Sequence, residues 1–174
     1  MRRAYTLTLL LTALTTFRVA EANQPREPMW SVSAGKLGVF DDIGDPFELG
    51  IAYRFRPVGM WSLLPAVGAT VHDNGAYFVY SELRREFRLG GSWLLVPSFG
   101  VGFFEDGKKL DLGHTVEFRS GLEVGHRLEN GWRVGVALLH LSNGGIGDRN
   151  PGTEAIVFSI SIPLSQGEPV TTLD

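Results

Sequence analysis

Eight runs of about ten to fourteen residues, in which apolar side chains alternate with polar or small ones, constrain the fold of this chain more than any other feature. Successive side chains of a β-strand point to opposite faces of a sheet, so this period of two predicts strands. Turn residues separate the predicted strands, which cover residues 30 to 40, 46 to 56, 61 to 72, 76 to 89, 92 to 104, 114 to 128, 132 to 142 and 154 to 164. The sequence therefore predicts an all-β protein.

The two faces of these runs differ in polarity. In the run 46 to 56, Leu49 and Ile51 are on one face, and Glu48 and Arg54 are on the other. Two later runs repeat the pattern. A soluble sheet protein would place the charged face in water and the apolar face in its core. Alternation alone therefore leaves two classes open, a soluble periplasmic β-protein and a membrane barrel.

Three further features favour the barrel. The polar faces mix acids and bases with glycines, as expected for the cross-paired interior of a narrow barrel. The number of strands is even, and their lengths suit a tilted span of about 9–11 residues. Aromatic residues lie near the ends of the runs, as in a girdle at a membrane interface: Trp30, Trp61, Trp93, Trp132, Tyr53 and Tyr77. We therefore predict an eight-stranded antiparallel transmembrane β-barrel of the outer membrane.

The first 22 residues have the pattern of a secretory signal peptide. Basic Arg2 and Arg3 precede an apolar run that is too short to span a membrane, and small residues flank a cleavage site after Ala22. Removing this segment lowers Lys plus Arg from 16 to 13 and Asp plus Glu from 19 to 18, so the mature charge is about −5 with neutral histidines. The expected domain organisation is a barrel of residues 23 to 164 followed by a polar tail, residues 165 to 174.

Link lengths predict the orientation, because such barrels have short periplasmic turns and longer external loops. The short links are 56 to 60, 89 to 92 and 128 to 131, and the links expected to face outward are 41 to 45, 73 to 75, 105 to 113 and 143 to 153. His72, Asp73 and His114 are expected to be solvated near these loops. Charges inside the barrel are expected to form a network that satisfies buried charge, including Glu82, Arg84, Glu117 and Arg119.

The stretch HLSNGGIGDRNPGTEA, residues 140 to 155, contains the candidate site. In the run 132 to 142 the apolar side chains are at even-numbered positions, and His140 and Ser142 belong to the same set. In the run 154 to 164 the apolar side chains are also at even-numbered positions, and this set begins with Glu154. All three side chains are therefore expected on the lipid-facing surface. Polar groups there lose water partners, which favours a functional role. The alternative is an ordinary polar turn at the rim of the barrel.

An antiparallel pairing that places Ser142 near Glu154 also places Trp132 near Leu164, which matches the lengths of both strands. Opposed Cβ atoms are then about 4.5–5.5 Å apart, and Glu154 reaches His140 as a diagonal neighbour. His140 and Ser142, two residues apart on one face, suit a hydrogen bond between imidazole and hydroxyl. A serine hydrolase requires such a set of nucleophile, base and an acid that fixes the tautomer of the base.

The same residues resemble a family signature. The motif of the PagL family, the outer-membrane lipid A 3-O-deacylases, is similar to His140-Leu141-Ser142-Asn143 followed by Gly145, Asn150, Gly152 and Glu154. The resemblance is specific at the last hairpin and general elsewhere, in size, strand count and position of the site. One departure is the polar tail after Leu164, where outer-membrane barrels commonly end in a strand with a terminal aromatic.

The resemblance implies a serine-type esterase that hydrolyses the acyl chain at the 3-position of lipid A, from a site that faces the outer leaflet of the bacterial outer membrane. Ser142 would be the nucleophile, His140 the general base and Glu154 its orienting acid. Three residues of the loop would complete the site, with Asn150 and the Gly145 N–H as oxyanion donors and Asn143 as a support. The acyl chains would lie along Leu138, Ile156 and Phe158.

The expected partners are lipid A in lipopolysaccharide and the surrounding lipid, and a homodimer is compatible with the sequence. An acidic chain gives no reason to expect nucleic acid, and the absence of cysteine excludes disulfides and thiol chemistry. No cofactor or metal is expected, because the histidines are scattered without ligand spacing. Two alternatives remain: a non-catalytic small barrel for adhesion or envelope structure, and another acyl enzyme, a phospholipase or a palmitoyl transferase.

Overall fold

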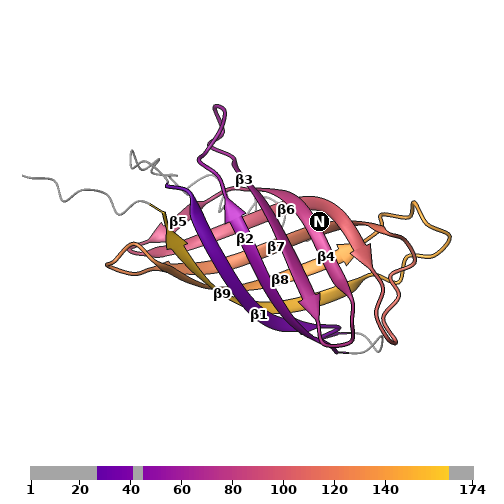
Figure 1. Cartoon of the computed structure of the whole chain (residues 1–174). Helices are drawn as coiled ribbons and strands as arrows, with labels where there is room; N and C mark the ends of the chain where they lie inside the picture. The colour runs from indigo at the N-terminus through magenta and orange to yellow at the C-terminus, as the bar shows by residue number, and fades with distance from the viewer. Residues whose placement is uncertain (1–26, 41–44, 165–174) are drawn as a thin grey trace, which may run out of the picture.

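The structure, a computed structural model, describes residues 27–40 and 45–164. The predicted signal peptide, the polar tail and most of the link 41 to 45 lie outside the described residues. Nine strands are arranged around a barrel (Figure 1): β1 (Met29–Leu37), β2 (Phe47–Arg54), β3 (Leu64–His72), β4 (Tyr77–Arg84), β5 (Phe87–Gly90), β6 (Trp93–Glu105), β7 (Val116–Arg127), β8 (Arg133–Ser142) and β9 (Thr153–Pro163). In this part of the chain, no helix is long and apolar enough to cross a membrane.

The sheet closes into the predicted eight-stranded antiparallel barrel. The strand order runs β4-β3-β2-β1-β9-β8-β7-β6-β5, and β4 also pairs with β6, which closes the sheet. The strands β4 and β5 together count as one of the eight strands of the barrel, because both pair with β6 and the register continues from one to the other. The break falls opposite Pro97, whose carbonyl accepts the N–H of Arg85 at 3.1 Å but which has no N–H to return. The predicted strand 76 to 89 is therefore split in two.

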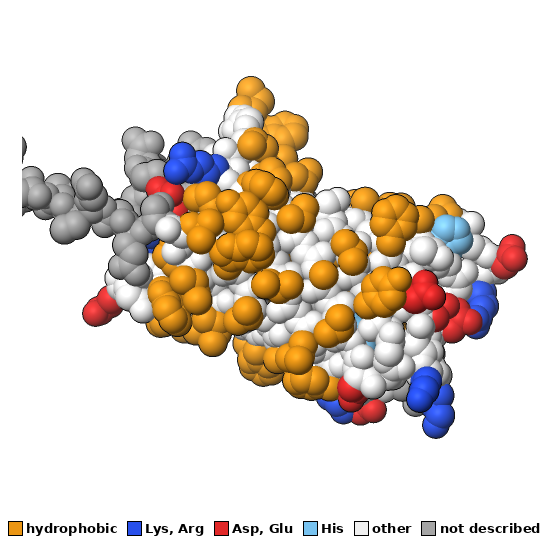
Figure 2. Space-filling model, in the orientation of Figure 1, with side chains coloured by type: hydrophobic (Ala, Val, Ile, Leu, Met, Phe, Trp, Pro, Cys, Tyr) orange, Lys and Arg blue, Asp and Glu red, His pale blue; other side chains and the backbone are white. Residues whose placement is uncertain are grey.

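The alternation separates a lipid-facing wall from a polar interior. In β2, Leu49 and Ile51 are half exposed on the outside, whereas Glu48 and Arg54 are 4% and 5% exposed on the inside. Hydrophobic side chains cover much of the barrel wall in the space-filling view (Figure 2). Charged side chains are concentrated near the two ends of the barrel in the same view. This distribution matches a barrel whose outer surface lies in hydrocarbon.

Ion pairs fill the interior between the strands. Glu86 binds both Arg54 and Arg133, and all three side chains are buried or nearly so. Arg84 pairs with Glu123, and Arg119 pairs with Glu82. Such pairing keeps buried charges from being left without a partner, which would be costly.

Glu117 does not join this network, although the sequence predicted that it would. Both of its carboxylate oxygens are buried without a hydrogen-bond partner in the described part of the chain. Arg119, the nearest inward-facing cation on β7, binds Glu82 and lies over the ring of Tyr80, with 4.4 Å from its Cζ to the ring centroid. The prediction was wrong for Glu117 because strand parity gives the face of a side chain and does not give its partner.

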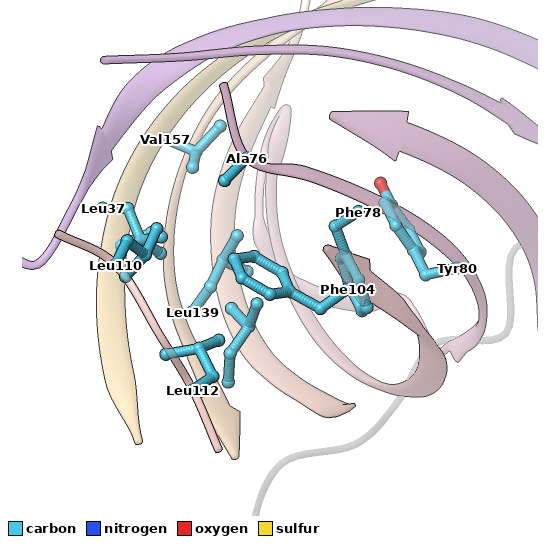
Figure 3. Packing of buried hydrophobic residues seen from close by; sticks show 11 residues of the cluster. Leu37, Ala76, Phe78, Tyr80, Phe104, Leu110, Leu112, Leu139 and Val157 are labelled. Atoms are coloured by element: carbon cyan, nitrogen blue, oxygen red, sulfur yellow. The ribbon is translucent and has the colours of Figure 1, made fainter. Parts of the chain in front are cut away.

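Residues 38–40 and 45–46 and the links 73–76, 106–115 and 143–152 lie at one end of the barrel, which we call the site end. The links 55–63, 91–92 and 128–132 lie at the opposite, far end. Near the site end, apolar side chains replace the ion pairs in the interior (Figure 3). Leu110 and Leu112 from the link after β6 are 0% exposed and pack with Phe104, Leu139 and Leu141. This packing fixes the inner face of β8 beneath the candidate site.

His72 contradicts the prediction that it is solvated. It has the inward parity of β3 and is buried, with Nε2 3.1 Å from Glu48 Oε2 and Nδ1 3.2 Å from the carbonyl of Ala76. Asp73, the next residue, has the opposite parity and is exposed as expected. His114 is half-buried, and its Nδ1 accepts the Val116 N–H at 2.9 Å. The prediction for His72 was wrong because it relied on the position near a loop, whereas the alternation along β3 already placed the imidazole inside the barrel.

Candidate active site on the last hairpin

The candidate site lies where β8 ends and β9 begins. Outward parity places His140, Ser142 and Glu154 on the wall of the barrel, with His140 exposed and the other two half-buried. His140 is directly opposite Glu154 in the sheet, and Arg133 is opposite Ser161. The expected pairing of Ser142 with Glu154 was wrong by two residues along the ladder. The observed register brings the glutamate closer to the histidine, because directly opposed side chains are nearer than diagonal ones.

A hydrogen bond joins the histidine to the glutamate. His140 Nδ1 is 3.0 Å from Glu154 Oε1. The carboxylate accepts only, so Nδ1 carries the proton and the neutral ring keeps its lone pair on Nε2. The pair therefore holds the imidazole in the tautomer that can receive a proton at Nε2.

Ser142 lies two residues beyond His140 on the same face of β8, where it is opposite Phe118 of β7. Among the described residues, no hydrogen bond joins the Ser142 hydroxyl to His140. Hydrogen bonds between catalytic groups are often long without substrate and tighten only in the substrate complex. The structure thus brings His140 and Glu154 into contact and leaves Ser142 as a neighbour on the same surface.

Gly152 leaves the space in which the imidazole ring lies. A Cβ atom at this position would be 3.2 Å from His140 Cε1 and 3.8 Å from Nε2. Its φ of 64° is also in the left-handed region that favours glycine. The nitrogen edge of the ring therefore faces the glycine at the end of the loop rather than a side chain.

For the deacylase activity that the sequence resemblance implies, with His140 as base, we expect Gly152→Ala to lower the rate of acyl release by about 100-fold, because a misplacement of a base by about 1 Å has an effect of that size. The added methyl group both strains the backbone and crowds Cε1 of His140. The rate is measured on the purified, folded variant. Gly75→Ala is the matched control, because it also has a positive φ and lies in a turn at the site end, but a Cβ there meets nothing within 4 Å. Equal losses in the two variants would contradict a role of Gly152 at the ring.

Asn143 organises the loop that follows Ser142. It is 0% exposed. Its Nδ2 donates to the carbonyl groups of Leu112 at 3.1 Å and Arg149 at 2.8 Å. Its Oδ1 accepts the N–H of Gly145 at 2.9 Å, and its own backbone N–H donates to Asn150 Oδ1 at 3.0 Å. One side chain therefore connects both halves of the loop to the neighbouring link.

These bonds bear on the two predicted oxyanion donors. The Gly145 N–H already donates to Asn143, so a role toward substrate requires that this bond be exchanged. The oxygen of Asn150 is engaged by the backbone of Asn143, which orients the side chain and leaves its NH₂ group as a donor. The geometry thus suits Asn150 better than Gly145, and both roles remain predictions.

For the same implied activity, we expect Asn143→Ala to reduce acyl release strongly while the barrel still folds. The change removes the partner of one carbonyl and one N–H in the loop, those of Arg149 and Gly145, and of the Leu112 carbonyl in the neighbouring link. A net hydrogen bond contributes about 0.5–1.5 kcal/mol. The measurement is the rate of release together with heat-modifiable migration of the folded barrel. Asn130→Ala is the control, because Asn130 accepts a similar N–H bond, from Trp132 at 3.1 Å, in a turn at the far end. An active Asn143 variant would show that the loop needs no such support.

A hollow on the outer wall adjoins the histidine on the side of β7. Ser120 is directly opposite His140 across that pair of strands. Ser120 was not among the predicted site residues, although a small polar residue within the apolar stretch of the outward face of β7, from Val116 to Val124, was a usable signal. Besides His140, the hollow is lined by Ser98, Ser120, Gly121, Leu122, Leu138, Leu139 and Glu154. Leu138 is thus shared with the path predicted for the acyl chains, whereas Ile156 and Phe158 lie on the other side, on β9.

Comparisons with known proteins agree with this arrangement. The family described as lipid A 3-O-deacylase (PagL) matches residues 50–163. The crystal structure of the outer membrane enzyme PagL is similar with a TM-score of 0.61 and 23% identity, over 78% of this chain and 99% of that chain. Neisserial surface protein A, NspA, is similar with a TM-score of 0.58 and 10% identity, over 78% of this chain and 95% of that chain.

A designed transmembrane β-barrel is also similar, with a TM-score of 0.55 and 14% identity, over 80% of this chain and 96% of that chain. No curated protein matches the chain. At these identities the solved structures define the fold alone, and that fold is the small transmembrane β-barrel of outer membranes. The family match covers more than half of the sequence. The chain belongs to the PagL family of lipid A 3-O-deacylases, and it is therefore a hydrolase of the outer membrane.

Proposed function

We propose that this protein removes the acyl chain at the 3-position of lipid A by a serine mechanism, with Ser142 as nucleophile, His140 as general base and Glu154 as the acid that orients it. The observation that carries the proposal is the 3.0 Å hydrogen bond between His140 Nδ1 and Glu154 Oε1, on the same outward surface as Ser142. A histidine held by an acid and adjacent to a serine is the arrangement that activates a hydroxyl for acyl transfer.

In the first half of the reaction, Ser142 Oγ attacks the carbonyl carbon of the ester as His140 Nε2 takes the hydroxyl proton. The tetrahedral intermediate then collapses, the bond to the sugar oxygen breaks, and His140 returns the proton to that oxygen. The acyl group is now bound to Ser142. In the second half, His140 takes a proton from water, the hydroxide attacks the acyl-serine, and the fatty acid leaves as Ser142 recovers its proton.

Negative charge develops on the ester oxygen in both halves. The NH₂ group of Asn150 is the proposed donor to it, since the oxygen of this side chain is already fixed by the Asn143 N–H. A second donor would be the Gly145 N–H after release from Asn143. In other hydrolases the removal of one such donor costs about 2.7–4 kcal/mol. Asn150 and Gly145, which bind Asn143 when no substrate is present, would thus bind the oxyanion in the substrate complex.

The outward position of the site suits a lipid substrate. Lipid A would approach from the outer leaflet without leaving the membrane, with its ester at the level of His140 and its acyl chain against the apolar wall. Leu122 and Leu138 line the hollow beside His140 and offer apolar contact. The longer links at the site end, such as 106–115 and 143–152, support an external position for this end.

The mass spectrum of lipid A tests the proposal. Lipid A is isolated from cells with and without the protein, and the proposal expects the loss of one 3-hydroxy fatty acid from the 3-position. Gain of a chain would indicate an acyl transferase, and release of fatty acid from phospholipids alone would indicate a phospholipase. An unchanged lipid A with folded protein present would favour a barrel without catalytic function.

A further inference from the structure

The link between β2 and β3 forms a defined finger rather than the short turn that the sequence predicted. We call residues 55–63 the β2–β3 finger. Val58 and Leu63 form a bridge, with N–H to carbonyl distances of 2.7 Å and 3.1 Å, and the Ser62 N–H donates to the Gly59 carbonyl at 3.2 Å. The finger stands away from the wall of the barrel at the far end (Figure 1). It is therefore a folded projection, held by its own hydrogen bonds.

The finger exposes large apolar side chains. Met60 is 85% exposed and Trp61 is 62% exposed, and Val58 and Phe55 are also exposed. Hydrophobic atoms cover its tip in the space-filling view (Figure 2). Such a cluster on a projection is unfavourable in water and marks an interaction surface.

The apolar surface of the finger continues the lipid-facing wall. Trp30 contacts Tyr53 with ring centroids 5.0 Å apart, and Tyr53 contacts Phe55 with ring centroids 4.7 Å apart. These rings lead from the barrel wall into the base of the finger. Trp93 begins β6 at the same end, and Trp132 directly precedes β8. Tryptophan and tyrosine gather where a membrane meets water, so the finger leaves the barrel at the level of that interface.

The charge and size of the finger favour lipid as its binding partner. Arg56 lies at the base of the finger with a side chain that is 72% exposed, 3.3 Å from Glu27. An arginine next to an apolar tip can direct its head to lipid phosphate while its neighbours enter the membrane. The finger has nine residues, whereas a stable protein interface engages about 20–30 residues a side.

We propose that the β2–β3 finger is an interfacial anchor. It lies along the membrane surface at the far end and inserts Met60 and Trp61 at the boundary between headgroups and acyl chains of the phospholipid leaflet. The anchor fixes the depth of the barrel at the end opposite His140. This role is independent of the proposed chemistry, since it uses no residue of the last hairpin.

A single thiol tests the anchor, because the chain contains no cysteine. Met60→Cys is labelled with an environment-sensitive fluorophore, and the full chain is placed in nanodiscs of phosphatidylethanolamine and phosphatidylglycerol, which leave both ends open to solvent. Glu129→Cys is the matched control, because Glu129 is exposed in the polar turn between β7 and β8 at the same end. We expect iodide in the buffer to quench the label at position 60 several-fold less than the label at position 129. Equal quenching at the two positions would overturn the proposal.

The native tryptophan gives a second measurement that needs no label. Trp30→Phe, Trp93→Phe and Trp132→Phe in one chain leave Trp61 as the only tryptophan. Lipids brominated near the headgroup end of the acyl chain are expected to quench its emission, independently of the ratio of protein to lipid. Emission that only aqueous iodide quenches would overturn the proposal. Shielding from both quenchers that disappears on dilution with lipid would also overturn it and would assign the finger to a contact between two copies.

Discussion

Replacing Ser142 with alanine will abolish the release of fatty acid from lipid A, with a loss in kcat on the order of 10⁶-fold, as for the nucleophile or base of other serine hydrolases. His140→Ala will cause a similar loss, because neither group acts without the other. The double variant will be no slower than either single variant. The measurement is the rate of 3-hydroxy fatty acid release by purified protein in detergent, with heat-modifiable migration as the check of folding.

Two other serines make this test specific. Ser81→Ala is the control, because Ser81 faces outward on β4, away from the last hairpin, and its loss should leave the rate unchanged. Ser120→Ala tests the assignment of the nucleophile, since Ser120 is directly opposite His140. If Ser120→Ala removes activity and Ser142→Ala retains it, the nucleophile lies on β7 and the proposed roles are wrong.

Glu86→Gln will lower the free energy of unfolding of the barrel by about 3–5 kcal/mol, the loss expected when one partner of a buried ion pair is removed. Glu86 binds Arg54 and Arg133, and the exposed fractions of these three side chains are 5%, 7% and 11%. Glutamine keeps the volume and removes the charge, so two guanidinium groups remain inside the barrel without compensation. The measurement is urea unfolding in lipid vesicles, followed by tryptophan fluorescence.

An exposed pair provides the control for stability. Lys36 and Asp45 form an ion pair with side chains 54% and 68% exposed. Exposed pairs contribute about 0–1 kcal/mol, so Lys36→Gln should change the free energy of unfolding by no more than that. A similarly small change in Glu86→Gln would show that water or a rearranged arginine compensates the interior charges.

The sequence predicted the fold well because the period of two is a local property. Each strand could be placed from its own residues, and the predicted runs overlap the observed strands throughout. The errors lie where hydrogen bonds between strands or within a link decide. Pro97 on β6 interrupts the strand 76 to 89 from across the ladder, and the link 56 to 60 became a finger of nine residues through its own hydrogen bonds.

The site was predicted in part for the same reason. Parity alone placed His140, Ser142 and Glu154 on one outward surface, and the structure agrees with that placement. The register between β8 and β9 was wrong by two residues, because strand lengths constrain pairing only loosely. A register shift of two residues keeps every side chain on the same face of the sheet. The error therefore changed which residues are opposed across the two strands, and it left each residue on its predicted face.

The sequence by itself determined which residues face lipid, which face the interior, and that the last hairpin places a histidine, a serine and a glutamate on one outward face. Tertiary structure decided which of these residues touch. It placed Glu154 opposite His140, made Asn143 the centre of the loop and turned His72 into a buried partner of Glu48. The physical reason is that facing depends on the alternation within one strand, whereas contact depends on the register between strands and on loops that fold across them.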